Sequence, residues 1–272
     1  TDNTLWGMGY GGYGTLGHGG TAAVPGVSSP IQIPGTTWAT GEGKLTNGNN
    51  STLAIKTDGT LWSWGYGNFV QLGNNKSFGS PGYIVSSPIQ IPGTNWTGTY
   101  DTMSCGYSTT RAIKTNGEMW SWGYNGSGNS GVNNITHYSS PVQVPGTWAV
   151  GYNKCIANHR STHAIRKDGS LWGWGGGNQG ILGLNDTTQY SSPKQVGSGT
   201  DWQAVTSNGS AQTIAVKTDG TMWSWGTMEN GGLGLNQGPG TASAFSSPIQ
   251  VGSGTNWSSN ISGGRNPVSY TH

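Results

Sequence analysis

The stretch K-T-D-G-T-L-W-S-W-G, Lys56 to Gly65, decides the fold because it recurs at a regular distance along the chain. Close copies begin at Lys114, Arg166 and Lys217, and a degenerate copy, T-D-N-T-L-W-G-M-G, begins at Thr1. A second mark also occurs five times: a Ser-Ser-Pro followed seven to nine residues later by a single tryptophan. Its prolines are 52 to 58 residues apart, a period near that of propeller blades and longer than that of the common helical repeats. The chain is therefore predicted to be an array of five structural repeats.

Each repeat carries the sequence pattern of four strands. Asp58-Gly59 lies between two β-rich runs, which predicts a hairpin because a type I′ turn requires positive φ at both central residues. The run S-S-P-I-Q-I-P-G adds a strand with proline near its ends, where a missing N–H does least harm, and the segment around the single tryptophan adds a fourth. No amphipathic helical pattern is present. The sequence predicts an all-β fold, a single five-bladed β-propeller of four-stranded antiparallel blades.

The composition supports a folded chain with no broad electrostatic footprint. Glycine (50 of 272 residues) and proline (12) are frequent, but 14 tryptophans supply the apolar surface that disordered segments lack, so glycine indicates turns. Charged residues make up 8% of the chain and the net charge is +2, which argues against nucleic acid or anionic membrane as a partner. No apolar run reaches the roughly 18 residues that span a bilayer, and no secretory signal is seen.

The two ends of the chain align as halves of one repeat. Residues near 1–10 supply the later strands of a blade and residues near 261–272 the earlier ones, so residues 1–272 are expected to form one domain closed by pairing of the terminal strands. The same arrangement permits exchange of the terminal strand between two molecules. Closure within one chain is the favoured alternative.

The repeated motifs resemble those of the regulator of chromosome condensation repeat family. The order is W-x-W-G, then a G-x-L-G stretch such as Gly14 to Gly17 or Gly180 to Gly183, then S-S-P-x-Q-V/I and a single tryptophan, and it covers the whole chain. This chain has five copies, whereas the best-known family members have seven blades. The resemblance implies one of several roles: exchange factor for a small GTPase, secreted inhibitor of β-lactamases, or surface protein of bacteria or viruses. The fold does not choose among them.

Catalytic, metal and cofactor sites are not predicted. Asp2, Asp58, Asp168 and Asp219 occupy one repeated turn position, and the other carboxylates are scattered, with none beside a histidine at a metal-binding spacing. The glycine-rich strings lack the helix that would hold a phosphate. Cys105 and Cys155 lie in corresponding strands of successive repeats and form either a disulfide or two buried free thiols, the second being favoured.

One segment concentrates positive charge. Lys154 to Lys167 holds four of the twelve lysines and arginines, together with two histidines, and Arg166 is assigned to the repeated Lys position. The remaining basic residues, Lys154, His159, Arg160 and His163, are interpreted as an anion-binding patch for a sulfated or phosphorylated glycan or an acidic protein surface. The alternative is a solvated strand edge.

The loops between W-G and S-S-P vary in length while their flanks are constant, and binding residues are usually found in such loops. Their aromatic side chains, set among Asn, Gly and Ser, suit sugars and adaptable protein contacts. The candidate ligand-binding residues are Tyr10, Tyr13, Tyr66, Phe69, Phe78, Tyr83 and Tyr138. The alternative is that these rings only cap the blade ends.

The function expected from the sequence is a non-catalytic binding or structural module that contacts a protein or glycan through its loops. The uncharged, Asn- and Thr-rich composition favours an extracellular or virion surface, with assembly into a larger particle or a strand-swapped array as a further expectation. The alternative is an inhibitor or regulatory protein-binding propeller, with GTPase exchange activity less favoured.

Overall fold

The computed structural model describes residues 2–270 apart from 21–25, 42, 49, 77–82, 94, 97–102, 152, 158–159, 208–210, 228–231, 237–243 and 263–268. The chain divides into two compact units. The first contains Thr1–Asn125 and Thr136–Gln143, and the second contains Gly126–Ile135 and Val144–His272. The two units are described separately below.

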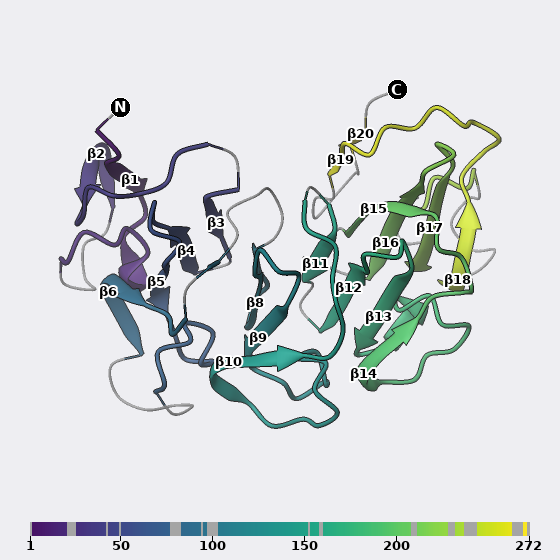
Figure 1. The fold of residues 1–272 in the computed structure, drawn as a ribbon, viewed down its shortest axis with the longest axis horizontal. Coiled ribbons are helices and arrows are strands. Elements are labelled where there is room, and N and C mark those ends of the chain that lie inside the picture. Colours follow the sequence, from purple (N-terminus) through teal and green to yellow (C-terminus); the bar gives the residue numbers. More distant parts are fainter. Residues whose placement is uncertain are drawn as a thin grey trace. The chain divides into compact units, whose positions relative to one another are not determined.

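The first unit begins with half a blade and continues with two full blades (Figure 1). The half blade pairs β1 (Leu5–Gly9) with β2 (Val27–Ile33), and the short helix η1 (Gly12–Gly14) lies between them in sequence. The next blade has the order β3-β4-β5-β6 (Leu45–Asn47, Ser51–Ile55, Leu61–Tyr66, Ile84–Gln90). The following one has the order β10-β9-β8-β7 (Tyr138–Val144, Met119–Gly123, Thr109–Ile113, Met103–Cys105).

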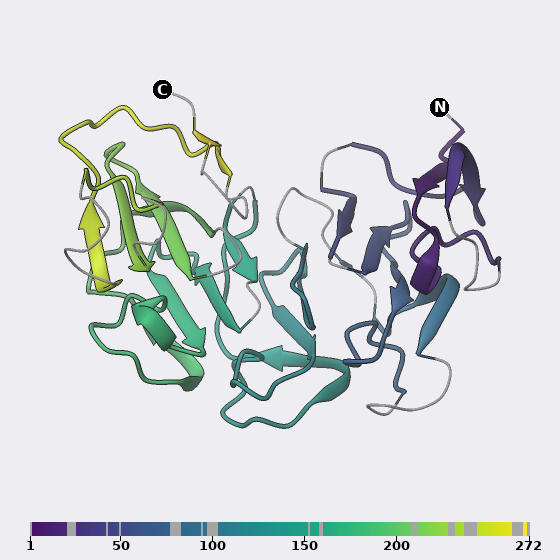
Figure 2. The same cartoon turned by 180° about the vertical axis from the view of Figure 1, so that it is seen from behind.

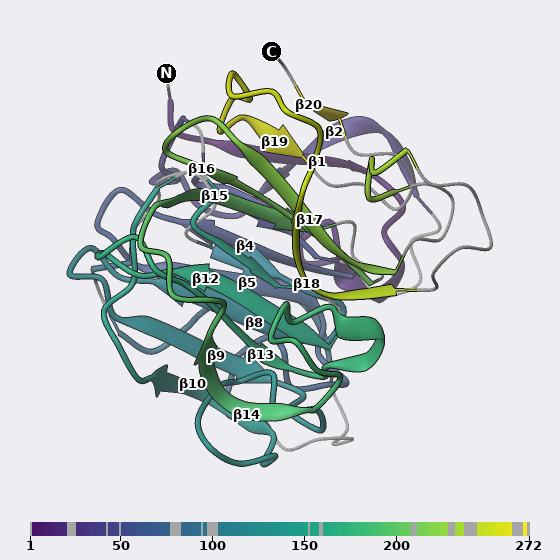
Figure 3. The same cartoon turned by 90° about the vertical axis from the view of Figure 1, so that its right-hand side faces the viewer.

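The second unit has the reverse arrangement, with two full blades followed by half a blade. One blade has the order β11-β12-β13-β14 (Cys155–Ala157, Ser161–Ile165, Leu171–Gly175, Tyr190–Gln195), with the short helix η2 (Asn178–Gly180) after β13. The other has the order β15-β16-β17-β18 (Trp202–Ser207, Gln212–Lys217, Met222–Thr227, Ala244–Gln250), and β16 and β17 run side by side in Figures 2 and 3. The pair β19 (Ile261–Ser262) and β20 (Ser269–Tyr270) follows.

The predicted all-β propeller class is confirmed, and the predicted hairpin forms. Its turn is not the expected type I′, because Asp58 lacks the positive φ that this type requires. Ile55 pairs with Leu61 across the Asp58-Gly59 turn, and Gly59 has a φ of 76°. The Asp58 carboxylate accepts hydrogen bonds from the backbone N–H and the hydroxyl of Thr60 at 2.9 and 2.6 Å. Asp168 and Asp219 make the same pair of bonds to Ser170 and Thr221. These carboxylates therefore stabilise turns.

The second tryptophan of each W-x-W connects one blade to the loop of the blade before it. Trp122 Nε1 donates to the carbonyl of Gln71 at 2.8 Å, and Trp225 Nε1 donates to that of Ile181 at 2.7 Å. Trp64 and Trp174 make the same contact with Thr15 and Asn129. These indoles are buried, so each bond forms away from competing water.

The first tryptophan of each W-x-W and the single tryptophan of the repeat enclose a cation. Lys56 Nζ lies 3.9 Å from the ring centroid of Trp62 and 5.1 Å from that of Trp38. Lys114, Arg166 and Lys217 lie over equivalent tryptophan pairs. A cation over two indole faces stabilises the stack by about 0.5–2 kcal/mol per contact. The tryptophans thus serve packing between and within blades.

The terminal half blades are each two-stranded sheets. β1 pairs with β2 and β19 pairs with β20, so each sheet contains half of the four strands found in a full blade. Trp6 and Met8 on β1 are exposed, whereas their counterparts Trp62 and Trp64 in β5 are more buried. Closure by pairing of the two ends, and the single-domain arrangement that depends on it, stay predictions.

Candidate functional site

One edge of each blade collects the segments that vary most. Because the strands are antiparallel, the turn between the first two strands and the loop after the third strand lie at the same edge. The Tyr66 backbone N–H accordingly donates to the Asn50 carbonyl at 2.7 Å, and that of Gly176 donates to the Arg160 carbonyl at 2.8 Å. We call the edge formed by these turns and loops the loop edge.

In the first unit the loop edge carries rings that contact one another in two groups. The rings of Tyr13 and Tyr66 are 4.8 Å apart and those of Tyr66 and Tyr83 are 5.2 Å apart, both with edge-to-face geometry. Phe69 lies 5.8 Å from Tyr107 and 6.1 Å from Tyr124. We call these six residues, Tyr13, Tyr66, Phe69, Tyr83, Tyr107 and Tyr124, the aromatic cluster.

The aromatic cluster is partly open to solvent and uncharged. Tyr13, Tyr83 and Tyr107 are 42%, 38% and 49% exposed. Burial, followed by the neighbouring Tyr83, Tyr13 and Tyr107 hydroxyls, raises the pKa of Tyr66, so its phenol stays protonated at physiological pH. Ring faces with hydroxyl tips can pack against apolar groups and still exchange hydrogen bonds. Exposed apolar surface that is contiguous in this way is typical of an interaction site.

Four of the predicted loop aromatics belong to this cluster: Tyr13, Tyr66, Phe69 and Tyr83. Tyr10 is exposed, and its hydroxyl lies over Gly12 at the start of η1. Tyr138 begins β10 and packs, half-buried, against the core cluster that contains Trp96 and Trp122, which is a structural position. Phe78 lies outside the described residues.

Tyr107 was not identified from the sequence. It occupies the short turn between β7 and β8. The candidate residues came only from the loops of variable length that follow each W-G. The signal was available, because antiparallel pairing places that turn at the same edge as the long loops. Tyr124, the second residue after Trp122, occupies the same place in its repeat as Tyr66 in its own.

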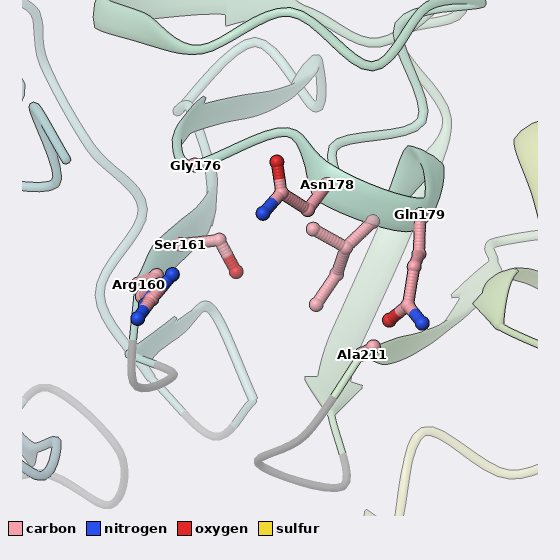
Figure 4. Close-up of a pocket in the computed structure, with 7 residues that line it drawn as sticks. Arg160, Ser161, Gly176, Asn178, Gln179 and Ala211 are labelled. Carbon is pink, nitrogen blue, oxygen red and sulfur yellow. The ribbon is translucent and has the colours of Figure 1, made fainter.

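In the second unit the loop edge holds a pocket instead of stacked rings (Figure 4). Its volume is about 210 Å³. Figure 4 shows Asn178 and Gln179 of η2 across the opening from Ser161, which begins β12, and Arg160, which precedes it, with Ala211 beside Gln179. The residues that line it are Arg160, Ser161, Gly176, Asn178, Gln179, Ile181 and Ala211.

The predicted anion patch is not assembled as one surface. His163 lies fully buried in β12, 5.8 Å from the ring of Trp225, and burial lowers its pKa to about 4. The Lys154 ammonium donates to the backbone carbonyl of Gln203, and burial lowers the pKa of this lysine. His159 lies outside the described residues. Arg160 is the member of the set that the structure places, exposed, on the loop edge.

The described residues provide little for metal-binding or nucleophilic chemistry. No group of three His, Cys, Asp or Glu side chains that could hold a metal occurs there. Cys105 and Cys155 are not joined by a disulfide, and burial raises the pKa of Cys105 to about 12, so this thiol is not a nucleophile at neutral pH. No described helix has the length and hydropathy needed to cross a membrane.

Comparison with known families identifies the repeats. The model of the Regulator of chromosome condensation (RCC1) repeat matches residues 58–113 and 168–216, and a second RCC1 repeat model matches residues 101–129. The mitochondrial RCC1 domain-containing protein RUG3 of Arabidopsis thaliana is 25% identical over 249 residues, which cover 89% of this chain and 53% of that protein. The ultraviolet-B receptor UVR8 of the same plant is 27% identical over 191 residues, covering 70% of this chain and 42% of the receptor.

Solved structures share the fold. Human WBSCR16 superposes with a TM-score of 0.75 at 16% identity, covering 97% of this chain and 66% of that one. Prp20p of Saccharomyces cerevisiae, studied for its binding to Gsp1p and histones, superposes with a TM-score of 0.71 at 16% identity, covering 97% and 62%. The chain therefore spans about half the length of these two plant relatives and about two thirds of these structures.

Proposed function

We propose that this chain, which matches RCC1 repeat models over residues 58–129 and 168–216, is a non-catalytic module that binds a protein partner through its loop edge. Relatives of the same repeat type include a light receptor and, in Prp20p, a protein whose binding to Gsp1p and histones has been examined. Regulatory binding of proteins is the role that these relatives share most plainly. For this chain the partner is inferred from its own surface.

The observation that carries the proposal is the aromatic cluster. Its rings bridge successive blades, since Tyr13 follows β1, Tyr66 ends β5 and Tyr107 precedes β8. Tyrosine offers large contact area at low entropic cost and is enriched among the residues that dominate protein interfaces. A series of half-exposed rings on a rigid scaffold is therefore suited to anchor a partner.

The test compares wild-type protein with a variant carrying Tyr13→Ala, Tyr83→Ala and Tyr107→Ala. Cross-linked partners captured by each form are quantified by mass spectrometry, and an unchanged thermal transition shows that the variant folds. We expect the wild-type chain to enrich a specific protein and the variant to lose it by about tenfold or more, since that factor corresponds to only about 1.4 kcal/mol. Leu45→Ala, which removes an exposed apolar side chain from β3, is the matched control and is expected to retain the partner.

Equal capture by the wild-type chain and the triple variant would contradict the proposal. A glycan-array signal that disappears in the same variant, with no protein captured, would reassign the cluster to a carbohydrate ligand, the other expectation from the sequence.

We also propose that the module acts at an extracellular or virion surface. Its support is compositional: 8% charged residues and many Asn, Ser and Thr. An antibody against the chain is expected to label intact particles or unpermeabilised cells. Labelling that requires permeabilisation would contradict this location.

A further inference from the structure

The pocket of the second unit occupies the same repeat position as the centre of the aromatic cluster. Both lie two to five residues after the second tryptophan of W-x-W: Tyr66, Asn68 and Phe69 in the first unit correspond to Gly176, Asn178 and Gln179 in the second. Tyr66 hydrogen-bonds with the Asn68 side chain, and its ring packs against those of Tyr13 and Tyr83. At the corresponding position of the second unit, Gly176 has no side chain, and Asn178 lines an open pocket.

The open space at Gly176 is compatible with a side chain. A Cβ placed there would meet Arg160 Cβ at 3.4 Å and Ser127 Cβ at 3.7 Å, which are ordinary contacts, and its φ is not left-handed. The backbone bond from Gly176 N–H to the Arg160 carbonyl would also be kept, as Tyr66 shows in the other unit. Glycine therefore stands where the corresponding repeat has a tyrosine, on a backbone bond that both repeats make.

The lining has the chemistry of an anion site. Arg160 is the charged residue among those that line the pocket, and among the described residues no carboxylate belongs to the lining. Within the described part of the chain, Arg160 takes part in no ion pair. Asn178 and Gln179 add amide N–H donors from η2, and Ile181 and Ala211 add apolar contact area.

We propose that this pocket receives the carboxylate of a glutamate or aspartate side chain from the protein that docks on the loop edge. The guanidinium of Arg160 would pair with the carboxylate, the amides of Asn178 and Gln179 would donate to it, and Ile181 would contact its methylene groups. The partner as the source of that side chain rests on the proposed function; the carboxylate specificity rests on the pocket itself.

Size and charge favour this ligand class. About 210 Å³ is below the usual 300–1,000 Å³ of pockets for drug-sized molecules and suits a single side chain. An arginine fork matches a planar carboxylate through two parallel hydrogen bonds, and such charge-assisted bonds are about twice as strong as neutral ones. A neutral side chain of the same shape would leave the guanidinium without its counter-charge.

The pocket is tested without any partner by NMR titration of the ¹⁵N-labelled full chain. The ligands are N-acetyl-glutamate methylamide, its isosteric N-acetyl-glutamine methylamide, acetate and inorganic phosphate, at constant ionic strength. We expect saturable shifts of the Asn178 and Gln179 side-chain amides and the Gly176 backbone amide with the glutamate derivative, and at least about tenfold weaker binding of the glutamine derivative.

Two variants locate the site. Arg160→Gln is expected to remove the saturable shifts by taking away the charge, and Gly176→Tyr to remove them by filling the pocket as Tyr66 fills its counterpart. Lys194→Gln, which deletes an exposed cation on β14 outside the pocket, is the matched control and should bind the glutamate derivative like wild type. The amide spectrum of each variant reports whether its fold is intact.

Several outcomes would overturn the inference: no saturable shift up to tens of millimolar, equal binding of the glutamine derivative, or binding that survives Arg160→Gln. Tighter binding of phosphate or of acetate than of the glutamate derivative would assign the pocket to another anion or to a free acid. Because the titration needs no partner, its failure would leave the test of the aromatic cluster untouched, and loss of that proposal would not alter the titration.

Discussion

The loop after β5 and the loop after β13 are held by the same backbone and carry opposite surfaces. Each places a backbone N–H against the preceding turn, at 2.7 Å from Asn50 and 2.8 Å from Arg160, and each offers a carbonyl to a buried tryptophan of the next blade. Yet Tyr66 and Phe69 build a ring cluster in one, whereas Gly176 and Gln179 leave a pocket in the other.

The difference shows how the repeat separates folding from recognition. Tryptophans, turn aspartates and left-handed residues fix the path of the loop, while the side chains two and five residues beyond W-x-W have no part in those bonds. At position two, tyrosine is replaced by glycine while the backbone bond to the preceding turn is kept. At position five the backbone also differs, because Gln179 has a φ of 58° whereas Phe69 is not left-handed. The following predictions test that separation, beginning with the largest effect.

If the two loops are held equivalently, removing the tryptophan that hydrogen-bonds to each loop should lower the free energy of unfolding by the same amount. Trp122→Ala and Trp225→Ala each delete a buried indole and its hydrogen bond to the preceding loop, and each is expected to lower the free energy of unfolding by about 3–5 kcal/mol. Urea denaturation followed by circular dichroism measures this. A difference of more than about 2 kcal/mol between the two would show that the loops are not held equivalently.

The second prediction concerns a buried strand position that is occupied by different residues in different blades. His163 in β12 stands where β4 has Leu53, and burial lowers its pKa to about 4 from 6.5. Between these values the unfolded chain binds the extra proton and the folded chain does not, so stability falls as pH is lowered from about 6.5 to about 4. The full loss would be on the order of 3 kcal/mol.

His163→Leu, which installs the residue found in β4, is expected to remove this part of the pH dependence. Urea midpoints measured from pH 7.5 to 4 for the two proteins give the comparison. An unchanged slope in the variant would mean that other groups carry it.

The smallest effect concerns backbone strain in the two loops. Val70 is held at a φ of 56°, where Gly180 in the other loop has 69°, and a β-branched residue there is strained by about 1–2 kcal/mol. Val70→Gly is expected to change stability by less than about 1 kcal/mol, because relief of strain offsets lost burial and the entropy of glycine. Gly180→Val should be far more harmful, since its Cβ would lie 2.4 Å from Ser246 Cα. Thermal denaturation of both variants measures the two changes in stability. Equal destabilisation by Val70→Gly and Gly180→Val would contradict the prediction.

Much of the fold followed from the sequence because its signals are local and repeated. Asp58-Gly59 predicts its hairpin alone, and four copies of W-x-W with a degenerate fifth at Trp6 predict five repeats. In the site, Tyr66 and Phe69 were found because variable loops draw attention to their aromatics. Tyr107 was missed because its turn is short, and only strand pairing brings it to Phe69.

The basic segment shows the opposite failure. The concentration of charge between Lys154 and His163 predicted a surface segment. In the structure all five residues of β12, including His163, are buried. Alignment with Leu53 and Ile214 in the neighbouring repeats would have placed His163 in the core. The pocket could have been anticipated by the same alignment of repeats, because Gly176 aligns with Tyr66.

The cations enclosed between tryptophans also have a kinetic consequence. Four of the twelve lysines and arginines lie against indole faces, and three of the ten carboxylates are bound in hairpin turns. With a net charge of +2 and much of its charge so engaged, the chain projects little long-range field. A partner would then find it by unsteered diffusion, with an association rate constant of about 10⁵–10⁶ M⁻¹s⁻¹ that varies little with salt, and the lifetime of the complex would be set by contacts at the loop edge.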